Sequence, residues 1–258
     1  MSNLPTIGFL GTGVIASALV EGFCQADTAY PLIVSPRNAE KAAALAAKYP
    51  RRVRVAADNQ QVLDEADWLI LAVVPSKGEE ILRALHFRPE HKVINLLSDK
   101  SLPQIAAWIG PTQLLVHMVP LPYVAQRIGP IALYPPNREV TELVAPLGQI
   151  VAVESAQEIK VLAAITALMA PYYTLLQQIV AWSGGEGLEE MPAKTYTAAF
   201  FGALSHLALA AEPGGLLMLS QEMTPGGLNE MAKNYIEAQH GFGCWVEALD
   251  PVLKRLQT

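Results

Sequence analysis

The stretch TIGFLGTGVIASAL, residues 6–19, decides the fold because it joins a buried strand to a helix through a glycine turn. The turn reads Gly11-x-Gly13-x-x-Ala16. In such a unit the first glycine permits the tight turn, the second lets a pyrophosphate approach the backbone, and the small third residue lets the helix pack on the sheet. The helix N-terminus supplies free N–H groups to the anion. The pattern predicts a dinucleotide site; a glycine turn that binds nothing is the alternative.

The rest of the first half alternates short apolar runs with helical patterns. This alternation is typical of right-handed crossovers and a mainly parallel sheet, so we predict an α/β fold with a Rossmann domain over residues 1–154. Further strands are predicted at PLIVS, RVRVA, WLILAVV, KVINLL and QLLVHMV, and edge strands at GPIALYP and IVAVES.

Near residue 155 the pattern changes to helices alone. SAQE, residues 155–158, is a capping box, and the helical stretches after it are broken at SGGEG, EPGG and TPGG. We therefore predict an all-helical second domain over residues 155–258. A domain of about a hundred residues this apolar can barely cover its own helices, which predicts a homodimer through the C-terminal helices.

Composition argues against several classes of partner. Hydrophobic residues make up 52% and charged residues 16%, and a net charge of −6 without a basic run disfavours nucleic acid. Cys24 and Cys244 lie far apart and are predicted to be thiols in a reducing cytoplasm, and the N-terminus carries no export signal. Residues 161–182 are long enough to cross a membrane. Their polar side chains and Pro171 favour instead a helix buried on all sides, and no membrane contact.

The loop after the second predicted strand indicates which dinucleotide binds. It reads SPRN, residues 35–38, and lacks the acidic residue that would bind the adenosine ribose of NAD. The hydroxyl of Ser35, the guanidinium of Arg37 and an amide suit a 2′-phosphate, so NADP(H) is the predicted cofactor. FAD is disfavoured because flavoproteins of this kind usually carry an acidic residue here. An ordinary solvated loop with one arginine is the alternative.

Four stretches resemble pyrroline-5-carboxylate reductase, a family that reduces a cyclic imino acid to proline with NAD(P)H. They are IGFLGTGVIASALVEGF, SPRNAEK, DNQQVLDEADWLILAVVP and TPGGLNEMAKNYIEAQHGFGCWVEALDPVLKRL. The resemblance covers nearly the whole chain and implies a Rossmann domain plus a helical domain that dimerises with interleaved helices. It places Asn59 at the adenosine ribose and Val73 and Pro75 on the wall of the cofactor cleft. It implies cofactor contacts at Gly11, Thr12, Gly13, Val14, Ile15, Ser35, Arg37, Asn59, Val73 and Pro75.

The substrate half departs from the family pattern at four segments. They are residues 97–99, 119–121, 167–170 and 228–229, where this chain has Leu-Ser-Asp, Val-Pro-Leu, Ala-Leu-Met-Ala and Leu-Asn. What the resemblance keeps is a set of candidate substrate-binding residues: Met118, Thr224, Gly226, Gly227 and Asn229.

The TPGG stretch is predicted to bind an anion. Gly226 and Gly227 would leave bare N–H groups before a helix, a nest that in the resembling family holds the substrate carboxylate. Asn229 is the candidate catalytic residue. Its amide can donate a hydrogen bond to a carboxylate or a ring nitrogen but cannot transfer a proton, so we expect it to position the substrate.

Three other polar residues are assigned structural roles. His117 is expected to be a hydrogen-bonded core histidine, with a catalytic role as the alternative. His206 is expected to be a buried polar partner at the subunit interface. Asp99 is expected to cap the helix that follows it. No group of Cys and His has metal-ligand spacing, so no metal is predicted.

Three functions fit these observations. The first is NADPH-dependent reduction of a cyclic imino acid, pyrroline-5-carboxylate or a relative, by hydride transfer from the cofactor. The second is reduction of a different imine or carbonyl substrate on the same scaffold, which the altered segments favour. The third is a non-catalytic NADP-binding protein, because a fold can be kept without its chemistry.

Overall fold

The computed structural model describes residues 4–257. Contacts divide the chain into two compact units. The first runs to Ala163 and also takes in the chain end from Leu256, and the second is Ala164–Arg255. The predicted domain boundary, between residues 154 and 155, lies just before helix α7 (Ala156–Ile165), whereas the division falls inside that helix.

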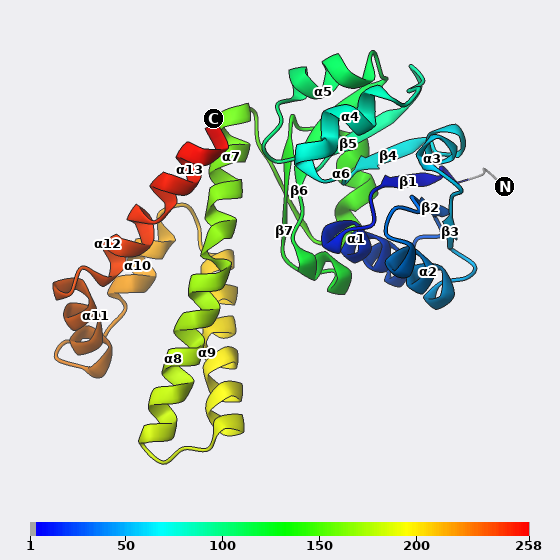
Figure 1. The fold of residues 1–258 in the computed structure, drawn as a ribbon. Helices are drawn as coiled ribbons and strands as arrows, with labels where there is room; N and C mark the ends of the chain where they lie inside the picture. The colour runs from blue at the N-terminus through cyan, green and yellow to red at the C-terminus, as the bar shows by residue number, and fades with distance from the viewer. Residues whose placement is uncertain (1–3, 258) are drawn as a thin grey trace. The chain divides into compact units, whose positions relative to one another are not determined.

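The first unit is built on an eight-stranded sheet in the order β3-β2-β1-β4-β5-β6-β7-β8. Figure 1 labels β1 to β7 of this sheet. All neighbours are parallel except β6 and β7. The order reverses between β1 and β4, the switch point at which such sheets bind ligands at their carboxyl ends. The strands are β1 Ile7–Leu10, β2 Leu32–Val34, β3 Val53–Val55, β4 Trp68–Leu71, β5 Lys92–Asn95, β6 Leu114–Val119, β7 Pro130–Tyr134 and β8 Gln149–Ala152.

Helices cover both faces of this sheet and close two apolar cores. One core holds residues of α1, α2 and α6, and the other holds residues of α3, α4 and α5. The predicted alternation of strands and helices is therefore confirmed. These helices are α1 Val14–Gln25, α2 Ala39–Lys48, α3 Asn59–Glu65, α4 Gly78–Arg83, α5 Leu102–Ile109 and α6 Arg138–Val144.

The cap of α5 differs from the prediction. Ser101, not Asp99, caps this helix: its hydroxyl accepts from the Gln104 N–H, and the Gln104 side chain accepts from the Ser101 N–H at 2.8 Å. Asp99 forms an ion pair with Lys100 instead. Ser101 lies directly before the first helical residue, in the Ser-x-x-Gln spacing of a capping box, so it takes the cap position.

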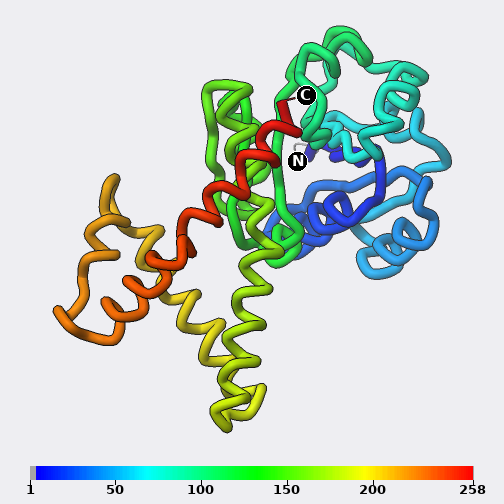
Figure 2. Tube along the Cα trace, turned by 60° about the vertical axis from the view of Figure 1, so that its left-hand side comes forward, coloured from blue at the N-terminus to red at the C-terminus, as the bar shows by residue number. Residues whose placement is uncertain are grey.

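The second unit consists of helices, and its breaks fall where the glycines predicted them. SGGEG ends α8, EPGG separates α9 from α10, and TPGG precedes α11. Helices α8 and α9 lie side by side in Figure 1, and Figure 2 shows them meeting at the end where SGGEG joins them. The rings of Tyr172 and Phe201 pack edge to face, with their centroids 6.2 Å apart. The helices are α8 Met169–Gly185, α9 Glu190–Ala210, α10 Gly215–Gln221, α11 Leu228–Ala238, α12 Gly241–Glu247 and α13 Leu249–Gln257.

The capping box predicted at residues 155–158 is present at the start of α7. The Glu158 carboxylate accepts from the Ser155 N–H at 2.8 Å, and the Ser155 hydroxyl accepts from the Glu158 N–H at 3.2 Å. A short 3-10 turn, Thr166–Leu168, separates α7 from α8. Pro171 lies in the first turn of α8, where its missing N–H leaves no hydrogen bond unmade. Cys24 and Cys244 are free thiols, as predicted.

The long apolar helical stretch is not buried within the chain. Among the described residues, Ala156–Gly185 is the one stretch long and apolar enough to cross a membrane, by length and composition only, and 11% of its apolar window is buried. The expectation of a helix buried on all sides is therefore wrong for the single chain. Within residues 164–255 only Ala164, Ser183, Ala193 and Thr197 are buried, so the other side chains of these helices are at least partly exposed in the single chain.

Candidate functional site

The turn after β1 requires glycine at position 11 for two reasons. Gly11 has φ +103°, a conformation that residues with a Cβ rarely adopt. A Cβ there would also lie 2.3 Å from the carbonyl oxygen of Ala72, just beyond the neighbouring strand β4. The predicted role of Gly11 in the tight turn is thereby confirmed, and the turn lies at the switch point of the sheet.

Gly13 and Ala16 differ in what surrounds them. Gly13 is the N-terminal flanking residue of α1, and a Cβ built on it would meet no atom of the described residues within 4 Å. Ala16 is buried in the core beneath the helix. The open space at Gly13 faces the start of a twelve-residue helix that carries no side-chain cap within the described chain. Free N–H groups and open space together suit an approaching anion.

Ser35 is hydrogen-bonded to two residues of this turn. Its hydroxyl accepts from the Gly11 N–H at 2.9 Å, and its carbonyl oxygen accepts from the Thr12 hydroxyl at 3.4 Å. Ser35 and Thr12 are both buried. The expectation that the Ser35 hydroxyl faces a 2′-phosphate is therefore wrong. Because β2 pairs with β1 in register, the residue that follows β2 comes to lie under the glycine turn.

A first cavity of about 350 Å³ opens beside the glycine turn. Arg37, which is exposed and lies two residues beyond Ser35, contributes to its wall, as does Val73, whose side chain is buried. Val14 is exposed at the start of α1, while Ile15 packs against the core. The cavity is lined by Gly11, Thr12, Gly13, Arg37, Asn38, Ala39, Ala72, Val73 and Val74.

A second cavity, of about 430 Å³, shares Arg37 with the first. Asn59, the first residue of α3, lies on its wall, so the structure brings together two cofactor candidates that are far apart in sequence. Sequence reasoning missed Lys77, although a lysine two residues after the Val-x-Pro turn was a readable signal. The cavity is lined by Pro36, Arg37, Ala57, Asp58, Asn59, Lys77, Glu80 and Ile81.

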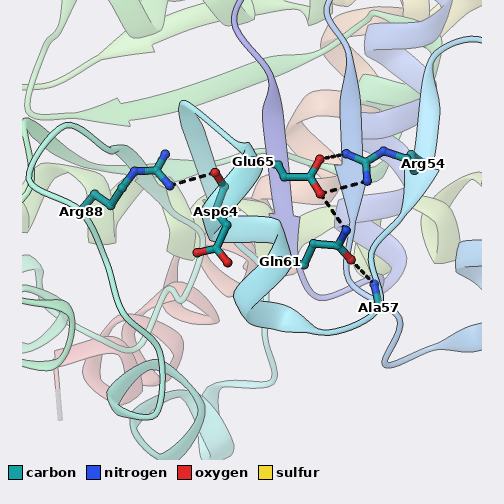
Figure 3. A network of polar contacts seen from close by, with 6 residues as sticks. All are labelled: Arg54, Ala57, Gln61, Asp64, Glu65 and Arg88. Carbon is teal, nitrogen blue, oxygen red and sulfur yellow. Dashed lines mark hydrogen bonds and ion pairs between the residues drawn. The ribbon is translucent and has the colours of Figure 1, made fainter.

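A polar network fixes the wall of the second cavity (Figure 3). The Ala57 N–H donates to Gln61 Oε1 at 2.6 Å, and Gln61 Nε2 donates to Glu65 Oε1 at 2.7 Å. Glu65 in turn forms an ion pair with Arg54 of β3. From the other side of α3, Arg88 donates to the carbonyl oxygen of Asp64 at 3.0 Å. The network ties the β3–α3 loop to its helix and holds the loop in place.

The cofactor candidate Pro75 and the substrate candidate Met118 have different environments. Pro75 is exposed and begins the short 3-10 turn Pro75–Lys77 that follows β4. Met118 is fully buried in the core on the α1 side of the sheet, where Val116 also points. The predicted substrate contact of Met118 is therefore not supported: side chains alternate along β6, and the position of Met118 faces the core.

His117 points to the opposite face of β6 and is buried, with 6% of its surface exposed. Its Nε2 has no hydrogen-bond partner among residues 4–257, so the expected hydrogen-bonded core histidine is wrong at this atom. Burial, and to a lesser extent the charge of Lys160, lowers the pKa of His117 to about 4. The imidazole is neutral near pH 7 and cannot serve as a general acid there.

The TPGG turn is closed by the chain itself. The Gly226 N–H donates to the carboxylate of Glu230 at 2.5 Å, and the Gly227 N–H donates to the carbonyl oxygen of Thr224 at 2.8 Å. The prediction of bare N–H groups at both glycines is therefore wrong, because a glutamate one turn into α11 reaches back to the loop. Asn229 is exposed in the first turn of α11. Thr224, Gly226, Gly227 and Asn229 thus lie together in the second unit, whereas the cofactor candidates lie in the first.

No group of three or more His, Cys, Asp or Glu side chains that could hold a metal ion occurs within residues 4–257. The chemistry available to the first unit is that of a glycine turn with a free helix N-terminus and two adjoining cavities that share Arg37. These features suit a large anionic ligand with separated phosphate groups.

Comparisons with known proteins agree with this geometry. A family model described as NADP oxidoreductase coenzyme F420-dependent matches residues 6–98. A search of curated proteins finds no match. Among solved structures, pyrroline-5-carboxylate reductase from Streptococcus pyogenes has a TM-score of 0.82 at 22% identity and covers 99% of both chains. The Coxiella burnetii enzyme has a TM-score of 0.83 at 22% identity, over 99% of this chain and 98% of that one.

Two further solved structures extend the comparison. Plasmodium falciparum pyrroline carboxylate reductase with NADP bound has a TM-score of 0.80 at 14% identity, over 98% of this chain and 97% of that one. An imine reductase from Pseudomonas sp. has a TM-score of 0.59 at 14% identity, over 79% and 75%. The chain therefore has the fold of the pyrroline-5-carboxylate reductases, a Rossmann sheet followed by an all-helical region, on a scaffold that imine reductases share.

Proposed function

We propose that this protein is an NADPH-dependent reductase of a C=N double bond. The observation that carries the proposal is the glycine turn at the switch point of the sheet, with open space at Gly13 and with Arg37 on both adjoining cavities. The shared fold with pyrroline-5-carboxylate reductases and an imine reductase supports the reaction class. The cofactor supplies the hydride, and the protein must hold the C=N bond close to it.

In this proposal the cofactor lies along residues 11–15. The pyrophosphate takes the N–H groups at the start of α1, Arg37 binds the 2′-phosphate, and Asn59 faces the adenosine ribose. Val73 and Pro75 form the wall of the cleft. Ser35 contributes by holding the turn through its hydrogen bond to Gly11 rather than by touching phosphate.

A cyclic imino acid, as in the reduction of pyrroline-5-carboxylate to proline, is the substrate class that the sequence resemblance favours. Thr224, Gly226 and Gly227 would then hold its carboxylate, and Asn229 would position the ring through its amide. A substrate carboxylate could bind this turn after displacing the Glu230 carboxylate from the Gly226 N–H.

The second candidate is the reduction of an imine without a carboxylate on the same scaffold. The observation that favours it is the hydrogen bond from the Gly226 N–H to Glu230, because the glutamate already supplies the negative charge that a substrate carboxylate would bring. Two carboxylates at one turn repel each other, so a neutral or cationic imine avoids this cost. The replacement of hydroxyl side chains by Leu228 and Asn229 acts in the same direction.

We also propose that the helical domain, residues 155–258, forms a homodimer in the cytoplasm and contributes to the substrate site. Large apolar side chains of α9 and α10 are exposed in the single chain, including Phe200, Leu204 and Leu207. A second copy of the chain would cover them, and His206, exposed between them, would become buried at that interface.

Oxidation of NADPH by the purified full-length protein tests the proposal. We would measure the loss of absorbance at about 340 nm with 1-pyrroline-5-carboxylate and with 1-pyrroline, which differ only by the carboxylate. Turnover of either imine supports a C=N reductase, and the ratio of the two kcat/KM values decides between the two candidates. NADPH binding with no turnover of these or larger cyclic imines and carbonyl compounds would favour a non-catalytic NADP-binding protein.

A further inference from the structure

The second cavity contains two cations, and they differ in what they contact. Its charged residues are Arg37, Lys77, Asp58 and Glu80. The Asp58 carboxylate accepts from the Gln61 N–H at 2.8 Å and so caps α3. Lys77 forms an ion pair with Glu80 at 3.2 Å, whereas Arg37 has no ion-pair partner among residues 4–257.

Lys77 enters the cavity from a different element than Arg37. It is the last residue of the 3-10 turn Pro75–Lys77, and the residues just before this turn, Val73 and Val74, line the first cavity. Arg37 comes from the loop after β2. The two cations therefore stand on separate loops at the carboxyl ends of β2 and β4, on the wall of one cavity.

The ion pair that occupies Lys77 is weak. The side chains of Lys77 and Glu80 are 57% and 76% exposed, and the two residues are three apart in sequence. Exposed pairs of this kind add little to stability because water and salt screen them and both side chains lose rotamer freedom. The Lys77 ammonium can therefore move to a phosphate in the cavity at small cost.

We propose that Lys77 is a second cationic contact for the 2′-phosphate of NADPH, acting together with Arg37. This inference rests on the proposed function, because it requires NADPH as the ligand. A phosphate takes a planar guanidinium on one side and a compact ammonium on the other, and both contacts are lost with NADH, which carries a hydroxyl there. Glu80 weakens the contact by competing for Lys77.

The test compares binding of NADPH and of NADH to the full-length protein and its variants by cofactor fluorescence. Lys77→Ala should weaken NADPH binding by about fivefold to tenfold, the effect of one charge-assisted contact in a solvated site, and leave NADH binding unchanged. Lys77→Arg should restore most of the loss. Glu80→Gln should strengthen NADPH binding by about twofold, because the competing carboxylate is removed.

Arg83→Ala is the matched control. Arg83 ends α4, the helix that follows Lys77; its side chain is 52% exposed and pairs with Glu79 at 2.9 Å, but it is not among the residues that line the cavity. Its loss should change neither affinity. Equal affinities of Lys77→Ala and wild type for NADPH, or equal losses for NADPH and NADH, would overturn the inference while leaving the proposed function intact. A wild-type protein that binds neither cofactor would instead overturn the proposed function.

Discussion

The two units of this chain bury their apolar residues to very different extents. In the first unit the strands β1, β2 and β4 are buried throughout, and helices close a core on each face of the sheet. In the second unit only Ala164, Ser183, Ala193 and Thr197 are buried, although α8 and α9 are long and apolar. The first unit has the Rossmann-like fold and closes its own core on both faces of the sheet. The second exposes large apolar side chains in the single chain, which is the basis of the proposed dimer.

This difference in burial leads to different expectations for the cofactor candidates of the first unit and the substrate candidates of the second. The glycine turn, Ser35 and the two cavities are held by the core and the hydrogen bonds of the first unit. The candidate substrate residues Thr224 and Asn229 belong to a unit whose own packing is incomplete. We therefore expect cofactor binding to depend on the first unit and substrate binding to depend on assembly.

The largest expected effect concerns the apolar surface of α9. Leu207→Asp places a charge where the proposed dimer buries a leucine, and an unpaired buried charge costs about 3–5 kcal/mol. Sedimentation velocity should show a wild-type dimer at micromolar concentration and a monomeric variant. Ile128→Asp is the control, because Ile128 is 55% exposed in the first unit and Leu207 is 57% exposed in the second. A folded wild-type monomer at micromolar concentration would refute the proposed dimer.

The next largest effect separates fold from binding within the first unit. Gly11→Ala should lower the free energy of unfolding by about 2–4 kcal/mol, because it combines a positive φ with a Cβ against the Ala72 carbonyl oxygen. The Cβ of Gly13→Ala would meet no atom of residues 4–257 within 4 Å, so this variant should leave the free energy of unfolding nearly unchanged while weakening the binding of NADPH. Urea denaturation and cofactor titration measure the two effects. Equal stability losses in both variants would contradict this description of the turn.

A smaller effect is expected at the shared wall of the two cavities. Arg37→Ala should weaken the binding of NADPH by about 1.5–3 kcal/mol, the usual contribution of a hydrogen bond to a charged group. It should weaken the binding of NADH far less. Arg83→Ala serves again as the control for loss of an exposed arginine. Equal losses for both cofactors would show that Arg37 does not contact the 2′-phosphate.

The smallest effect is a pH dependence from His117. Its pKa is lowered to about 4 in the folded chain, below the ordinary histidine value of about 6.5. As the pH falls, the imidazole is therefore protonated first in the unfolded chain, and the free energy of unfolding decreases. Between about pH 6.5 and pH 4.5 the loss from this residue should be about 2 kcal/mol. In urea denaturation at both pH values, the decrease in the free energy of unfolding should be smaller by this amount in His117→Asn than in the wild type. His91, whose pKa is also lowered, is retained in both proteins and cancels in the comparison.

The difference between the units also explains which features of the structure could be predicted from the sequence. Strand and helix alternation, the role of Gly11 and the capping box at Ser155 depend on local spacing, and the structure confirms them. The role of Ser35 could not be read, because it depends on the register of β2 beside β1. Neither could the burial of Met118, which depends on which face of β6 meets α1.

The second unit was harder to predict for a physical reason. The Glu230 carboxylate accepts a hydrogen bond from the Gly226 N–H, four residues earlier, and so competes with an external anion for this donor. The glycine motif alone does not indicate this contact. The exposure of Ala156–Gly185 could not be foreseen either, because burial of an apolar helix depends on a layer that this chain does not provide within residues 4–257. Fold class is local and repetitive, whereas site chemistry depends on individual contacts.

Titration of the full-length protein with NADPH, followed by cofactor fluorescence and repeated with NADH, tests the central claim most directly. We predict saturable binding of NADPH to the first unit and weaker binding of NADH, with the difference reduced in Arg37→Ala. Absence of NADPH binding at millimolar concentration, in a protein whose folding is confirmed by circular dichroism, would contradict the nucleotide site and with it every function proposed here.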